Sequence, residues 1–256
     1  MQNIDFHSHE QQDEFIFNLF RQKQNGFFLD ISCGNPVIGS NTYTLEKYCG
    51  WSGFCFDTMK NSTWSEWRTS PLINMDVTSE DMADFLISNI PTSKVIDYIS
   101  LDVDADGVNL SSLALKRILQ SNIKFKAMTL EHESYIHGDY VQNRTAYLLE
   151  ERGFISLFKN VHLWSGGVDD DSNAQFEDWW IHPDYFSKSI LQIREEGLYY
   201  FQCIDKLKKT LGNKYNASHN CSRAWPEEYR LFWNEQEMDF QKDFFSKMTK
   251  DRNACI

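Results

Sequence analysis

The chain has 256 residues, 41% of them hydrophobic and 24% charged. These proportions exclude a wholly disordered or collagen-like chain, and the length suits one domain with an appendage better than two equal domains. The formal charge of −12 has the wrong sign for a surface that binds nucleic acid non-specifically. No apolar run approaches the roughly 18 residues that span a bilayer, so we expect no membrane span.

The start of the chain has neither the basic nor the apolar part of a secretory signal, since it carries Asp5, His7, His9 and Glu10. The six cysteines include no Cys-x-x-Cys pair, and three of them lie in strongly apolar stretches. This pattern favours buried thiols over disulfides or a zinc site. We therefore predict a cytoplasmic protein.

From residue 11 onward the sequence alternates between two patterns. Amphipathic segments predict helices, and short apolar runs that end in an acid or a turn predict buried parallel strands. The predicted helices are 11–24, 40–50, 78–89, 111–121 and 139–152, and the predicted strands are 27–31, 51–57, 95–104 and 125–131. This alternation is typical of an α/β, Rossmann-like protein with a doubly wound, mostly parallel sheet and helices on both faces.

The last strand pair differs from the others. Residues 154–158 and 176–181 are separated by a polar, Gly- and Asp-rich segment, which predicts an antiparallel hairpin. From about residue 184 the strand patterns stop and two helical patterns follow, at 187–211 and 226–250. We predict a main domain over 1–183 and a C-terminal helical extension over 184–256 that acts as a lid or an interface.

Acidic side chains follow the predicted strands. In an open α/β sheet, ligands bind outside the carboxyl ends of the strands, so these side chains should face one crevice. They are Asp30, Asp57, Asp76, Asp102 with Asp104, and Glu131 with Glu133.

The first two strand ends together fit a nucleoside. Asp30-x-Ser32-x-Gly34 is a small-residue turn along which a backbone can approach a ligand, and Asp57 can accept hydrogen bonds from both hydroxyls of a ribose. Asn35-Pro36 follows where a dinucleotide site usually has more glycine. The pattern therefore disfavours NAD and favours a nucleoside without phosphates.

Four ordered blocks carry a family resemblance. They are Asn25-Gly26-Phe27-Phe28-Leu29-Asp30-Ile31, Ser40-Asn41-Thr42-x-x-Leu45-Glu46-Lys47, Gly50-Trp51-x-Gly53 and Asp97-Tyr98-Ile99-Ser100-Leu101-Asp102-Val103-Asp104. Over roughly residues 8–183 the chain resembles the FkbM-type S-adenosylmethionine-dependent methyltransferases. The resemblance implies a seven-stranded class I methyltransferase sheet and transfer of a methyl group to a hydroxyl of a sugar or small metabolite.

Three positions depart from the family pattern. Ser32 stands where the family usually has glycine, and Asp57 stands where it usually has glutamate. Asp104-Ala105-Asp106-Gly107 stands where the family more often has an acid followed directly by glycine, which implies a loop longer by two residues after this strand.

The resemblance also implies a role for each cofactor residue. Asp30, Ser32, Gly34 and Asn41 would lie along the methionine end of S-adenosylmethionine. Asp57 would hold the ribose, and Asp76 would contact the adenine.

Methylation of an alcohol needs a base near the methyl group, because the hydroxyl proton must leave during transfer. The predicted catalytic residues are Asp104, His132 and Asp102. Asp102, Glu131 and Glu133 offer the oxygen ligands of a Mg²⁺ or similar divalent cation site, similar to that of some antibiotic-sugar methyltransferases. The alternatives are a turn cap for Asp104, a buried polar role for His132 and a salt bridge to Arg144 for the glutamates.

The leading hypothesis is thus an O-methyltransferase acting on a carbohydrate or glycoconjugate hydroxyl. Its partners would be S-adenosylmethionine and a small-molecule or glycan acceptor, with homo-oligomer formation as one role for the extension. One alternative keeps the fold and cofactor but methylates a non-sugar molecule. A second alternative is a catalytically silent binding or scaffold domain, in which Ser32 marks a lost cofactor site.

Overall fold

The computed structural model of the chain describes residues 3–103, 110–132, 134–163 and 174–219. The chain divides into two compact units, Met1–Cys221 and Ser222–Ile256. The second unit, and with it the predicted helix 226–250, lies outside the described residues.

The centre of this unit is an eight-stranded sheet with the order β4-β3-β2-β5-β6-β8-β7-β9. Strands β2 to β6 are parallel, whereas β8 runs antiparallel to both of its neighbours, β6 and β7. The strands are β2 (Phe27–Ile31), β3 (Ser52–Asp57), β4 (Leu72–Asn74), β5 (Val95–Leu101), β6 (Lys124–Glu131), β7 (Ile155–His162), β8 (Gln175–Ile181) and β9 (Glu195–Glu196). The predicted α/β class, mostly parallel sheet and closing hairpin are confirmed, and β9 adds a two-residue edge to the seven strands expected.

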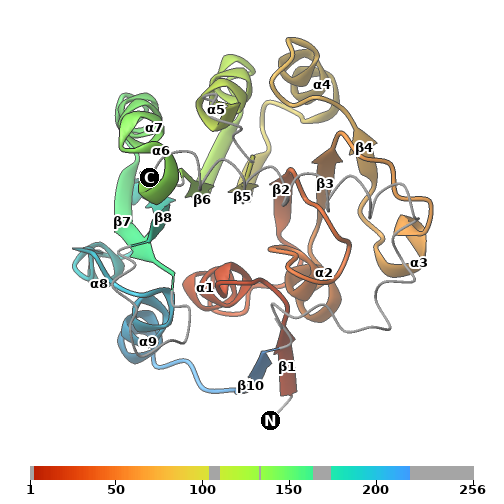
Figure 1. Cartoon of the computed structure of the whole chain (residues 1–256). Helices are drawn as coiled ribbons and strands as arrows, with labels where there is room; N and C mark the ends of the chain where they lie inside the picture. Colours follow the sequence, from red (N-terminus) through yellow and green to blue (C-terminus); the bar gives the residue numbers. More distant parts are fainter. Residues whose placement is uncertain (1–2, 104–109, 133, 164–173, 220–256) are drawn as a thin grey trace, which may run out of the picture. The chain divides into compact units, whose positions relative to one another are not determined.

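Helices cover both faces of this sheet (Figure 1). One face carries α4 (Asp81–Asn89), α5 (Leu110–Gln120) and α7 (Tyr140–Glu150), and the other carries α1 (Gln12–Leu19), α2 (Tyr43–Cys49) and α9 (Tyr200–Leu211). Short helical turns complete the unit: α3 (Trp64–Trp67), α6 (Ser134–His137), η1 (Pro183–Tyr185) and α8 (Lys188–Leu191). The sheet is therefore doubly wound, as predicted.

Alternate strand residues feed two separate hydrophobic cores. Trp179 belongs to the core under α1 and α2, where it stacks on Phe15 with ring centroids 4.3 Å apart. Its neighbour Trp180 belongs to the core under α4, α5 and α7. Adjacent strand residues point to opposite faces, so the sheet separates the two hydrophobic cores.

The Gly26 and Gly50-Trp51-x-Gly53 blocks are explained by packing. A Cβ atom on Gly26 would lie 2.4 Å from the Trp51 ring, and one on Gly53 would lie 2.1 Å from the Phe28 carbonyl oxygen. Only glycine fits at these two positions, since such distances are far below van der Waals contact. These two glycines therefore allow β2 and β3 to pack closely.

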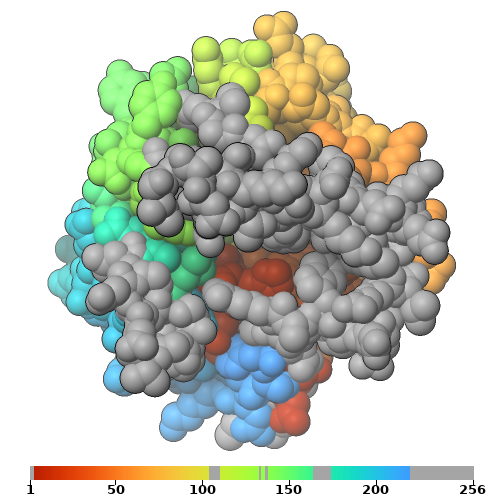
Figure 2. Space-filling view, in the orientation of Figure 1, coloured from red at the N-terminus to blue at the C-terminus, as the bar shows by residue number. Residues whose placement is uncertain are grey.

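The N-terminal strand β1 (Asn3–Phe6) pairs in parallel with β10 (Asn216–His219), which the sequence did not predict. Figure 2 shows the blue surface of this C-terminal segment beside the red N-terminal surface. Behind it, the Glu14 carboxylate is 1% exposed and accepts hydrogen bonds from Lys208 Nζ at 2.7 Å and Tyr215 Oη at 2.6 Å. His219 Nε2 lies 2.6 Å from the same carboxylate. One buried charge thus ties α9 and β10 to α1.

Two predicted helices differ from the structure. The predicted helix 11–24 ends at Leu19, because Arg21 and Gln22 adopt left-handed backbone angles. The predicted helix 187–211 is wrong, since α8, β9 and α9 replace it and Gly197, with φ 75°, turns the chain between them. The extension is therefore not wholly helical, and the first compact unit reaches beyond the predicted limit at residue 183. Its role as a lid or an interface stays a prediction.

Within the described part of the chain, no helix combines the length and apolarity needed to cross a membrane. Cys33, Cys49, Cys55 and Cys203 are free and buried, as the cysteine pattern predicted.

We predict that the His219–Glu14 contact makes stability depend on pH. The hydrogen bond to Glu14 raises the pKa of His219 above its ordinary value of 6.5. The stabilisation should therefore be complete below pH 6.5 and disappear as the pH rises through the raised pKa. In urea unfolding, His219→Gln should be clearly less stable than the unaltered protein at about pH 6, with a smaller difference at about pH 9.

Tyr215→Phe is the control, because it removes a neutral hydrogen bond to the same carboxylate. The loss in the free energy of unfolding caused by Tyr215→Phe should be the same at both pH values. An equal His219→Gln penalty at both pH values would contradict the assignment.

Candidate functional site

The carboxyl ends of four neighbouring strands are level with one another. Ile31 of β2 pairs with Phe56 of β3 and Leu101 of β5, and Leu101 pairs with Leu130 of β6. The next residue on each strand is therefore at the same edge, and these residues are Ser32, Asp57, Asp102 and Glu131. The backbone N–H of Asp102 also donates to the Ile31 carbonyl at 3.2 Å. The register brings these predicted site residues to one edge, as expected from a parallel sheet.

The turn after β2 is joined to the end of β3 through Asp57. The Gly34 backbone N–H donates to Asp57 Oδ2 at 2.9 Å, and the Met59 backbone N–H donates to Oδ1 at 2.8 Å. Ser32 and Gly34 both have left-handed backbone angles, with φ of 63° and 58°. Among the described residues, no atom lies within 4 Å of where a Cβ of Gly34 would be. A compact turn therefore presents backbone and one carboxylate to the open edge.

Asp30 and Asn41 lie beneath this turn. Asp30 is 2% exposed, and its Oδ2 accepts from Thr42 Oγ1 at 2.6 Å. Burial raises the pKa of Asp30, although the Arg68 charge acts in the opposite direction. Asn41 Nδ2 donates to Ser100 Oγ at 2.9 Å. Both side chains are thus hydrogen-bonded within the protein below the turn. Their contact with a cofactor stays a prediction.

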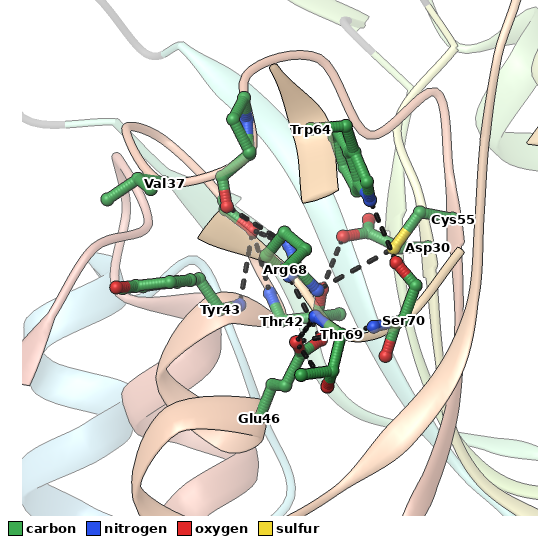
Figure 3. Close-up of polar contacts among 12 residues, drawn as sticks. Asp30, Val37, Thr42, Tyr43, Glu46, Cys55, Trp64, Arg68, Thr69 and Ser70 are labelled. Atoms are coloured by element: carbon green, nitrogen blue, oxygen red, sulfur yellow. Dashed lines mark hydrogen bonds and ion pairs between the residues drawn. The ribbon is translucent and has the colours of Figure 1, made fainter. Parts of the chain in front are cut away.

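The main residue that sequence reasoning missed here is Arg68, which follows α3 (Figure 3). Its side chain is fully buried and bonds Glu46 Oε2 at 3.0 Å, Ser40 Oγ at 3.1 Å and Thr42 Oγ1 at 2.8 Å. Glu46 in turn accepts from the backbone and side chain of Thr69. The Ser40-Asn41-Thr42 and Glu46 blocks are thus one network, and the only sequence cue to Arg68 was a lone basic residue after two tryptophans.

A second missed residue, Glu177, is buried at the other half of the edge. It pairs with Glu131 across β6 and β8, is 2% exposed, and accepts from Trp179 Nε1 at 2.6 Å. Burial, together with the nearby carboxylates of Asp102 and Glu10, raises the pKa of Glu177 well above its ordinary value. Its protonated form is therefore favoured, whereas Asp102 and Glu131 at the same edge are partly exposed.

His132 lies on the opposite face from Glu177. Its Nδ1 accepts from the Ser134 backbone N–H at 3.2 Å, and its Nε2 lies 3.4 Å from Asp178 Oδ1 and 3.3 Å from Gln142 Nε2. The ring is 2% exposed. Both nitrogens are thus engaged in a buried polar network under α7, which matches the alternative of a buried polar role, and a catalytic role for His132 stays a prediction.

The remaining predicted residues are placed as follows. Asp76 is exposed two residues beyond β4, and its Oδ1 accepts from the Thr78 backbone N–H at 2.9 Å and from Thr78 Oγ1 at 2.7 Å. Asp104 and Glu133 lie outside the described residues. Within the described ranges, no three His, Cys, Asp or Glu side chains form a group that could hold a metal ion. Asp102 and Glu131 therefore do not form a cation site by themselves, and the predicted site needs a further ligand.

Comparison with solved structures finds likenesses at low sequence identity. Human methyltransferase-like protein 13 in complex with SAH is 13% identical, with a TM-score of 0.46 over 87% of this chain and 97% of that one. The MycE methyltransferase from the mycinamycin biosynthetic pathway, in complex with Mg and SAH, is 12% identical, with a TM-score of 0.43 over 66% of this chain and 47% of that one. No family model matches the sequence, and no curated protein matches it.

The sheet and the level strand ends therefore define the chain as an α/β protein of the Rossmann-like, doubly wound class.

We predict that Ser32→Gly stabilises the protein. The left-handed angle at Ser32 costs an L-residue about 1 kcal/mol that glycine does not bear. The free energy of unfolding in urea should therefore rise by up to about that amount. Ser52→Gly is the control, because a strand position without a left-handed angle should lose about 0.5–1 kcal/mol. A loss of stability in Ser32→Gly would contradict this explanation.

Proposed function

We propose that the protein is an S-adenosylmethionine-dependent methyltransferase of the kind the FkbM resemblance implies. The observation that carries the proposal is the Gly34–Asp57 contact at 2.9 Å, which sets a small-residue turn and a carboxylate side by side at the strand ends. A nucleoside needs both features, a backbone that it can approach and an acceptor for its ribose hydroxyls. Each Asp57 oxygen accepts one amide and keeps a second acceptor site, so both can still bind hydroxyls.

The bound cofactor would supply a methyl group on a sulfonium. The chain's own task is then to hold the acceptor and to remove its proton. Asp102 follows β5 directly beside the turn that starts at Ser32. We propose Asp102 as the acceptor-binding carboxylate, with Asp104 or His132 as the base. Glu177 lies near Asp102, and burial together with the Asp102 carboxylate raises the pKa of Glu177.

We propose a sugar or glycoconjugate hydroxyl as the acceptor and a divalent cation as its aid. Asp102 and Glu131 follow paired residues of neighbouring strands, and carboxylate oxygens suit Mg²⁺. Glu133 would be the third ligand. A non-sugar small molecule remains the alternative acceptor.

A second candidate function is a catalytically silent binding domain. The observation that favours it is that Asp57 already accepts two backbone amides, while Ser32 carries a side chain where the resembling family has glycine. Cofactor binding separates the two candidates.

We predict micromolar binding of S-adenosylhomocysteine by isothermal titration. Asp57→Ala should weaken it at least about tenfold, because the ribose acceptor and the anchor of Gly34 are both lost. Asp57→Glu should bind as well as the unaltered protein, since it keeps both oxygens. Asp84→Ala, on the exposed side of α4, is the charge-matched control and should change nothing. Absence of binding in the unaltered protein would sink the proposal.

We also predict that Asp102→Asn lowers methyl transfer by about tenfold or more, because the acceptor loses a hydrogen bond to a charged group, while S-adenosylhomocysteine affinity stays within about twofold. The readout is methylated product from a panel of sugar, glycoconjugate and non-sugar acceptors, detected by mass spectrometry.

If a cation assists, EDTA should abolish transfer and added Mg²⁺ should restore it. Full activity in EDTA would contradict the proposed cation. Transfer to non-sugar acceptors alone would favour the alternative substrate.

A further inference from the structure

The Arg68 guanidinium has an acceptor for each of its N–H groups. Arginine carries five such donors in a rigid planar fork. The acceptors are Glu46 Oε2 at 3.0 Å, the Pro36 carbonyl oxygen at 3.2 Å, Ser40 Oγ at 3.1 Å, Thr42 Oγ1 at 2.8 Å and Cys55 Sγ at 3.6 Å. This full set explains how a charged group can be completely buried here.

Three of these acceptors belong to the segment that joins β2 to α2. Pro36, Ser40 and Thr42 lie within residues 33–42, which form no helix or strand of their own. Such a segment costs about 1 kcal/mol or more per residue to order. Thr42 Oγ1 passes the connection on to Asp30, to whose Oδ2 it donates at 2.6 Å. The guanidinium therefore fixes the inner side of this segment to the sheet.

The outer end of the same segment is the turn of the proposed cofactor site. Gly34 is held there by Asp57, and Asn41 is held by Ser100. Between these two contacts, the Arg68 bonds to Pro36 and Ser40 set the path of the chain. A change in that path would move the Gly34 backbone, although the substituted side chain itself would not contact the ligand.

We infer that Arg68 is a positioning residue for the nucleoside site, holding residues 33–42 in the shape that binds the cofactor. This inference rests on the proposed function. Lysine cannot replace arginine in this role, because it offers three donors from one point and cannot reach five acceptors in a plane. A lysine at position 68 would keep the positive charge but lose the planar arrangement of five donors.

The test compares Arg68→Lys with Asp97→Asn as a matched control. Asp97 is also buried, at 3% exposure, and binds Lys23 and Lys126 at 2.7 and 2.6 Å, but it lies near the start of β5, away from the edge with the proposed site. Both variants disrupt an ion pair of a buried side chain and should lower stability in urea. Only Arg68→Lys should weaken S-adenosylhomocysteine binding, by about tenfold.

A local readout separates positioning from a general loss of stability. Hydrogen exchange of the backbone amides in 33–42 should accelerate in Arg68→Lys and stay unchanged in Asp97→Asn. If Arg68→Lys does not fold, Thr42→Val serves instead, because it keeps the shape of the side chain and removes the link between Arg68 and Asp30.

The outcomes are distinct. Weaker binding and faster local exchange in the Arg68→Lys or Thr42→Val variant would support the inference. Unchanged affinity in a folded variant would overturn it while leaving the cofactor site in place. Absence of binding in the unaltered protein would overturn the proposed function, and this inference with it.

Discussion

Burying a guanidinium requires an acceptor for every N–H, and around Arg68 this requirement shapes the cofactor half of the sheet edge. The five acceptors come from α2, β3 and the segment 33–42, so satisfying one side chain fixes three parts of the chain at once. Removal of the charge would leave Glu46 and Asp30 without their nearest compensation. The geometry of the turn at Gly34 is therefore set by a side chain that is itself fully buried.

The edge is divided between two chemical environments. At β2 and β3, polar atoms are paired within the protein, and a turn and one carboxylate face outward. At β5, β6 and β8, the edge carries three acidic residues, Asp102, Glu131 and Glu177, and burial raises the pKa of Glu177 well above its ordinary value. The first environment suits the uncharged ribose of a nucleoside. The second suits either an acceptor hydroxyl that must lose its proton or a cation. The proposed transfer runs from one half to the other.

The sequence predicts the elements whose pattern is local. The strand 27–31 was predicted without error, because an apolar run and a turn define it within a few residues. The β1–β10 pair could not be foreseen, since its partners are more than 200 residues apart, β1 alternates over four residues alone, and β10 has no apolar alternation. The sequence also placed the acids at the strand ends, but it could not tell that His132 enters a buried network on the other face. Arg68 was missed because its importance lies in five acceptors that only the fold assembles.

The central claim is that the turn after β2 and Asp57 together hold the nucleoside of S-adenosylmethionine. A crystal structure of the chain with S-adenosylhomocysteine tests it most directly. We expect density at the carboxyl ends of β2 and β3, with the ribose hydroxyls on Asp57 and the homocysteine end beside Gly34. Density at another place, or a ribose that leaves Asp57 bonded to backbone amides alone, would contradict it.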